Sequence, residues 1–69
     1  MDINILRERY TKGCKLKLTA PLEDKYSPKA IGDVMIVEYV DDMGNIHGSW
    51  QSGGSLALIQ GVDSFVKIE

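Results

Sequence analysis

The stretch "DVMIVEYVDDMGNIHGSW", residues 33–50, has the pattern of two strands joined by a short turn. Its first half is rich in β-branched and aromatic side chains, which favour strands. Its second half places Ile46, Gly48 and Trp50 on one face of an extended chain. The letters DDMG at 41–44 suit a type I turn whose last residue, a glycine, adopts a positive φ angle. The stretch therefore predicts a β-hairpin with the tryptophan in the core.

Three titratable residues of this hairpin, Asp41, Asp42 and His47, are candidates for a metal or acid/base site. Near a turn the two aspartates are expected to point in opposite directions, and His47 is expected on the outer sheet face, so the three ligands would not converge. An acid/base pair of Asp42 and His47 would also need a pocket. The short strands of this chain are expected to form a small barrel, and apolar side chains would leave no such pocket inside it. We expect the aspartates to build the turn, and we expect no metal, no cofactor and no enzymatic activity.

Other elements are expected on both sides of the hairpin. Asp2 can cap a short helix over residues 3–10. Residues 14–19, "CKLKLT", alternate apolar and polar side chains with the period of a half-buried strand. After the hairpin, "SLALI" at 55–59 and "FVKIE" at 65–69 are two further short strands, separated by a bend.

Five short strands, closely spaced turns and one long loop after the first strand predict a mainly β fold. The specific expectation is a small five-stranded antiparallel SH3-like barrel with a short N-terminal helix. An OB barrel is less suitable because it usually needs longer strands and a helix between the third and fourth. We expect a single domain over residues 1–69, with the helix and an arm at 1–12 and the barrel at 13–69.

Composition and cysteine usage exclude several classes of protein. The apolar runs are too short to span a bilayer, and the first residues lack the apolar stretch of a secretory signal. We therefore expect no membrane association and a cytoplasmic location. Cys14 is the only cysteine, which excludes an internal disulfide and a thiolate metal cluster. Its strand position predicts a small buried side chain beside Leu16 and Leu18.

The chain resembles a family of small bacterial, phage and mobile-element proteins classed as a domain of unknown function. The resemblance covers about residues 13–66 and is carried by the motifs "GCKLKL", "LEDKY", "GD", "VDDMGNIHGSW" and "SLALIQGVDSF". It implies a small β-barrel and no known activity. Two departures concern packing: Met35 stands where the family usually has glycine, and Gly48 where it has a β-branched residue. Gly48 should leave a gap beside Trp50 unless Met35 or Met43 fills it.

The loop at residues 20–32 is the best candidate for a binding surface. Pro21 and Pro28 prevent a regular ladder, and loops of this length in compact domains are often functional. Aromatic side chains offer flat contact area and acids select basic partners, which points to a protein or peptide partner. The candidate protein-binding residues are Leu22, Glu23, Asp24 and Tyr26. The alternative is that Leu22 and Tyr26 merely pin the loop to the barrel.

Charge suggests a second hypothesis. The net charge of −2 argues against a nonspecific nucleic-acid coat, but residues 1–19 carry five basic and two acidic side chains, or +3. A nucleic-acid-binding accessory protein would use these as phosphate contacts: Arg7, Arg9, Lys12, Lys15 and Lys17. The simpler interpretation is that Lys15 and Lys17 form the solvated face of a strand. A third hypothesis is a homodimer that pairs through the helix and an exposed apolar strand face.

Overall fold

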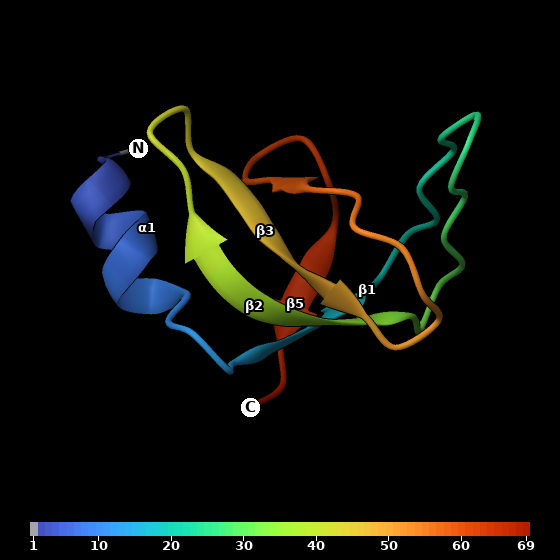
Figure 1. The fold of residues 1–69 in the computed structure, drawn as a ribbon, viewed down its shortest axis with the longest axis horizontal. Helices are drawn as coiled ribbons and strands as arrows, with labels where there is room; N and C mark the ends of the chain where they lie inside the picture. The colour runs from blue at the N-terminus through green and yellow to red at the C-terminus, as the bar shows by residue number, and fades with distance from the viewer. Residues whose placement is uncertain (1) are drawn as a thin grey trace.

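The computed structural model describes residues 2–69 and is mainly β, as predicted. A five-stranded antiparallel sheet follows one short helix, and the sheet order is β4-β3-β2-β1-β5 (Figure 1). The elements are α1 (Ile3–Arg9), β1 (Lys15–Leu18), β2 (Val34–Val40), β3 (Asn45–Trp50), β4 (Leu58–Ile59) and β5 (Phe65–Lys67). The helix and the loop between β1 and β2 lie at opposite ends of the long axis in Figure 1.

The sheet is not closed. Within residues 2–69 no ladder joins the edge strands β4 and β5, and the bend between them holds only an isolated bridge between Gln60 and Asp63. The strand expected over residues 55–59 is also shorter than predicted. The indole Nε1 of Trp50 donates to the carbonyl of Leu56 at 2.7 Å, so the chain at this point is held by a side chain rather than by a ladder.

The helix begins as the sequence predicts. The Asp2 carboxylate accepts a hydrogen bond from the backbone N–H of Asn4 at 2.8 Å, which satisfies one of the unpaired donors of the first turn. Leu6 is buried, and α1 contacts β2. The helix ends at Arg9, one residue before the predicted end, because Tyr10 leaves the helical conformation while its N–H still donates to the Leu6 carbonyl.

The core lies on one face of the sheet, and α1 adds Leu6 to it. Cys14 is buried beside Leu16 and Leu18, as the strand parity predicts, and burial raises the pKa of its thiol. A β-bulge between Val37 and Tyr39 shifts the register of β2 against β3. The buried apolar residues are Leu6, Tyr10, Cys14, Leu16, Leu18, Met35, Val37, Val40, Ile46, Trp50 and Leu58.

Gly48 is required by close packing at the centre of the β2–β3 hairpin. A Cβ atom at this position would lie 2.2 Å from the Ile36 carbonyl oxygen and 2.9 Å from Met35 Cγ. Of the two methionines expected to fill the gap, Met35 does so and is fully buried, whereas Met43 is 85% exposed. The space left by the missing side chain is therefore occupied, and the hairpin has no room for a larger residue.

Candidate functional site

The 20–32 loop is more ordered than its sequence suggests. Leu22 and Lys29 form an antiparallel bridge in which each N–H donates to the other's carbonyl, at 2.9 and 3.0 Å. At the tip, one carboxylate oxygen of Asp24 accepts from the backbone N–H groups of Tyr26 and Ser27, both at 2.8 Å. The segment is therefore a narrow arm with a closed tip rather than an irregular loop.

Lys29 anchors this arm to the sheet, a role that the sequence analysis did not identify. The residue is only 7% exposed, and its Nζ lies 5.5 Å from the centroid of the Trp50 ring. The ammonium donates to the Gly53 carbonyl and to Ser52 Oγ, in the turn after β3. No sequence signal marks this lysine, because lysines are usually exposed and no acidic residue stands near it at a spacing that indicates an ion pair.

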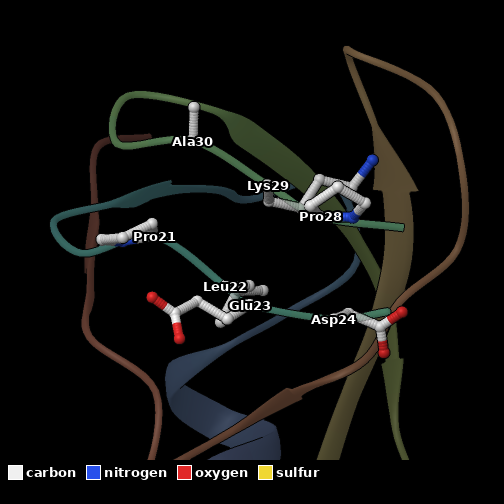
Figure 2. Close-up of a pocket in the computed structure, with 7 residues that line it drawn as sticks. All are labelled: Pro21, Leu22, Glu23, Asp24, Pro28, Lys29 and Ala30. Carbon is white, nitrogen blue, oxygen red and sulfur yellow. The ribbon is translucent and has the colours of Figure 1, made fainter. Parts of the chain in front are cut away.

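A groove with a volume of about 630 Å³ lies along the loop (Figure 2). Leu22, partly buried, packs against the core. In Figure 2 the side chains of Glu23 and Asp24 come from the outgoing arm, with their carboxylates well apart, and Pro28 and Lys29 come from the returning arm. The lining is Pro21, Leu22, Glu23, Asp24, Pro28, Lys29 and Ala30, so the groove combines apolar walls with two carboxylates.

The structure brings three of the four predicted protein-binding residues together. Leu22, Glu23 and Asp24 line the groove, whereas Tyr26 stands at the tip beside it. Tyr26 is 87% exposed, and Lys25 Nζ lies 5.6 Å from its ring centroid. The interpretation that Leu22 pins the loop agrees with its core contact, but the same interpretation is wrong for Tyr26, which has almost all of its surface in water.

The predicted basic set is divided by ion pairs. Arg7 contacts Asp42 at 2.7 Å and also donates from Nε to the Val40 carbonyl, and Lys15 contacts Glu69 at 3.1 Å. The other members of the set, Arg9, Lys12 and Lys17, are exposed and make no ion pair within the described part of the chain. Two of the five positive charges are therefore already matched by carboxylates.

Asp41 and His47 lie close together, whereas the acid/base pair considered from the sequence was Asp42 and His47. His47 Nε2 lies 2.7 Å from Asp41 Oδ2, and the imidazole stacks on the Tyr39 ring with centroids 4.6 Å apart. The Asp41 carboxylate folds back over the turn, where its other oxygen accepts from the N–H groups of Met43 and Asn45. The hydrogen bond with His47 is the main cause that lowers the pKa of Asp41 to about 2, followed by the one with the Asn45 N–H.

Asp42, by contrast, points away from His47 and pairs with Arg7, as its alternation with Asp41 predicts. In residues 2–69 no group of three or more histidine, cysteine, aspartate and glutamate side chains is arranged to hold a metal ion. The Asp41 carboxylate accepts hydrogen bonds from two backbone amides, the Asn45 side chain and His47. It is therefore fully occupied in holding the turn.

Residues 1–68 match the model of a family described as a domain of unknown function, DUF4314. The chain belongs to the DUF4314 family. Comparison of this DUF4314 chain with curated proteins and with solved structures found no match. Within residues 2–69 the helix α1 lacks the length and apolar character needed to cross a membrane. The match agrees with the expectation of an uncharacterised domain family, and it also covers the N-terminal helix.

Proposed function

We propose that this DUF4314 domain is a non-enzymatic interaction module that binds a peptide segment with basic side chains on a protein partner, through the 20–32 loop. The observation that carries the proposal is the anchored loop itself. It combines an apolar groove, two carboxylates and an exposed tyrosine on a support fixed by Lys29. Buried anchors surrounded by polar groups are the usual composition of a protein-binding surface.

The scaffold supports this proposal. We infer an SH3-like fold from the strand order β4-β3-β2-β1-β5 together with a long loop between β1 and β2. In domains of that kind, the loop after the first strand borders the groove in which partner peptides lie. Fold alone does not determine function, so the proposal depends on the residues of the groove.

Charge complementarity favours a basic peptide. Glu23 and Asp24 both line the groove. The one lysine of the lining, Lys29, directs its ammonium to Gly53 and Ser52 of the neighbouring turn. The carboxylates therefore set the charge offered to a partner, and a lysine or arginine side chain is the group that they complement.

The order of the loop favours binding as well. The Leu22–Lys29 bridge, the capped tip and the Lys29 anchor restrict the backbone before any partner arrives. A loop that is ordered in advance loses less conformational entropy on binding, which leaves more of the contact energy available as affinity.

Other observations support a binding role over catalysis or nucleic-acid binding. The Asp41–His47 pair lies at the β2–β3 turn, and the hydrogen bonds of its carboxylate hold that turn. Arg7 and Lys15, two members of the basic set, are engaged by Asp42 and Glu69. We therefore favour the peptide-binding hypothesis and use the nucleic-acid hypothesis as a competing outcome.

The test is a selection from a displayed library of random peptides against the immobilised chain. Enriched peptides should be rich in lysine and arginine, and after resynthesis their affinity should fall about tenfold for Tyr26→Ala and for Asp24→Lys. Tyr39→Ala is the matched control, since Tyr39 is also exposed but lies on β2, outside the loop. Thermal midpoints of the Tyr26→Ala and Tyr39→Ala chains show that each variant is folded.

Two results would overturn the proposal. One is equal peptide affinity for the wild-type chain, Tyr26→Ala and Asp24→Lys. The other is a fluorescence anisotropy change with labelled DNA or RNA that weakens with salt and with Arg9→Ala, while no displayed peptide is retained. The second result would establish the nucleic-acid hypothesis instead.

A further inference from the structure

A second groove adjoins the first on the other side of the loop's outgoing arm. It has a volume of about 220 Å³ and lies between this arm and residues 56–63, which include β4 and most of the bend after it. Leu22, Glu23 and Asp24 line both grooves. The full lining of the second groove is Leu22, Glu23, Asp24, Leu56, Ala57, Ile59 and Asp63. The two grooves therefore form one surface crossed by residues 22–24.

We propose, as an extension that rests on the function proposed above, that the second groove is a specificity subsite of the same peptide-binding surface. It accepts an aliphatic side chain of the partner peptide, next to a lysine or arginine. Ala57, Ile59 and Asp63, which lie far from the 20–32 loop in sequence, would then take part in partner selection.

The size of the groove favours a side chain over a small molecule. Pockets that enclose metabolites or drug-sized ligands usually have volumes of about 300–1,000 Å³. The value of about 220 Å³ is below that range. Its walls include the aliphatic side chains of Leu22, Leu56 and Ile59, and Ile59 is 44% exposed. An aliphatic side chain placed there would remove apolar surface of both chains from water.

The charge around the groove selects the neighbouring residue of the peptide. Glu23, Asp24 and Asp63 line it, and within the described residues its lining contains no lysine, arginine or histidine. Lys29 lines only the first groove. A cationic side chain is attracted to this edge, whereas a phosphate or an acidic peptide would meet like charges. This charge pattern separates a basic peptide from a nucleic-acid backbone.

The wall formed by the bend is fixed in place. The Asp63 carboxylate accepts from the Ile59 N–H at 2.7 Å, and the Ile59 carbonyl accepts from the N–H groups of Val62 and Asp63 at 3.1 and 2.9 Å. The opposite wall belongs to the arm held by the Leu22–Lys29 bridge. Both walls are therefore formed before a partner binds, as a subsite requires.

The experiment compares two charge insertions that lie five residues apart in the chain. Ala57→Arg places a long cation inside the second groove, just before β4, whereas Val62→Arg places it on the bend after β4, outside the lining, at a residue that is 73% exposed. The probes are the resynthesised peptides from the random library. We expect Ala57→Arg to weaken their binding about tenfold and Val62→Arg to change it less than about twofold. Replacing the peptide's aliphatic residue by alanine should weaken binding to the wild-type chain in the same way.

The outcomes separate this inference from the proposed function. Peptides that lose affinity for Tyr26→Ala and Asp24→Lys but bind Ala57→Arg as tightly as wild type would leave the proposed function in place and refute the subsite. A library selection that yields no peptide binding the wild-type chain, or that enriches acidic peptides, would refute both the proposed function and the subsite. A second copy of the chain could occupy the groove instead of a peptide. Sedimentation would then depend on protein concentration, and Ala57→Arg would abolish that dependence. This result would also refute the inference.

A measurement on the wild-type chain covers the case in which Ala57→Arg does not fold. Addition of an unlabelled peptide to the ¹⁵N-labelled domain should shift the amide signals of residues 56–59 together with those of residues 22–26. Shifts confined to residues 22–26 would refute the subsite without the use of any variant.

Discussion

Two turns of this domain are built by the same chemistry and differ in what surrounds them. Asp41 and Asp24 each use one carboxylate oxygen to accept two backbone N–H groups, at 2.8–2.9 Å. The second oxygen of Asp41 is also bound, by the Asn45 amide and by His47, and its turn joins two long paired strands. The turn at Asp24 closes an arm with a single bridge and carries the exposed Tyr26.

Under the proposed function, the hairpin stabilises the fold and the 20–32 loop binds the partner. The polar groups of the β2–β3 hairpin form contacts within the domain, and one face of the hairpin is buried in the core. The 20–32 loop is held by a few contacts at its base and tip and presents its remaining groups to solvent. Substitutions in the hairpin should therefore change the free energy of unfolding, and substitutions at the exposed loop positions should change binding.

The largest effect is expected at the centre of the hairpin. Gly48→Val would place a Cβ atom 2.2 Å from the Ile36 carbonyl oxygen, which belongs to the paired backbone and cannot move without breaking the ladder. We expect the free energy of unfolding to fall by about 3 kcal/mol, the upper part of the usual range for overpacked cores. Urea denaturation followed by tryptophan fluorescence measures this, since Trp50 lies in the core.

Ser49→Val is the matched control for this experiment. It introduces the same side chain at the next position of β3, where the residue is exposed. Its unfolding midpoint should stay close to that of the wild-type chain. If the Gly48→Val chain were as stable as the Ser49→Val chain, the hairpin would not be closely packed. The claim that the hairpin determines stability would then fail.

The second prediction concerns the anchor that joins the two regions. Lys29→Met retains the aliphatic stem over Trp50 but removes the ammonium that donates to Gly53 and Ser52. We expect a loss of about 2 kcal/mol, the usual contribution of hydrogen bonds from a charged group. Hydrogen exchange should become faster at the Leu22 and Lys29 amides, which form the bridge.

Lys25→Met is the control, because Lys25 belongs to the same loop and is exposed. It should leave both the unfolding midpoint and the exchange rates unchanged. Equal exchange rates in the Lys29→Met and wild-type chains would mean that the arm is ordered by its own bridge and tip alone.

Periodicity in the sequence was sufficient for most of the fold. The alternation of residues 14–19 placed Cys14 in the core, and the DDMG letters placed Gly44 in a turn with a positive φ angle. Both are local properties, in which side-chain parity or a single backbone angle decides the structure. The strand at 55–59 was predicted too long because a tertiary contact, from the Trp50 indole to the Leu56 carbonyl, is not encoded in local alternation.

The candidate site was predictable only in part for a similar reason. Residue type and position marked Leu22, Glu23 and Asp24 as candidates, because a long loop is often functional and its acids can select a basic partner. The buried Lys29 and the second wall at residues 56–63 depend on segments far apart in the sequence. The Asp41–His47 contact was missed because strand parity does not describe a carboxylate that folds back over its own turn.

The third prediction uses acid to test the hairpin turn. The pKa of Asp41 is lowered from 3.8 to about 2 in the folded chain, so its ionised carboxylate stabilises the fold at pH values above about 4. That contribution is lost as the pH falls from about 4 to about 2, because the Asp41 carboxylate binds a proton more readily in the unfolded chain than in the folded one. At neutral pH, Asp41→Asn should be less stable than the wild-type chain, with a smaller loss than that expected for Lys29→Met. Between about pH 4 and pH 2, it should lose less stability than the wild-type chain does.

Unfolding curves at several pH values measure both parts of this prediction. An NMR titration of the Asp41 carboxyl carbon reports the pKa directly and is independent of the stability data. Identical acid dependence of stability in the wild-type and Asp41→Asn chains would show that the contacts with His47 and the two amides do not favour the folded state.

The smallest effect on stability is expected at the tip of the loop. Tyr26→Ala removes a side chain that is 87% exposed, whereas the hydrogen bonds of the tip use the backbone N–H of Tyr26 and are retained. The free energy of unfolding should therefore change by less than about 0.5 kcal/mol, the usual range for surface positions. Thermal and urea unfolding measure this. A clear loss of stability would mean that the ring packs against the domain in solution, and the contrast between the structural hairpin and the exposed loop would then fail at Tyr26.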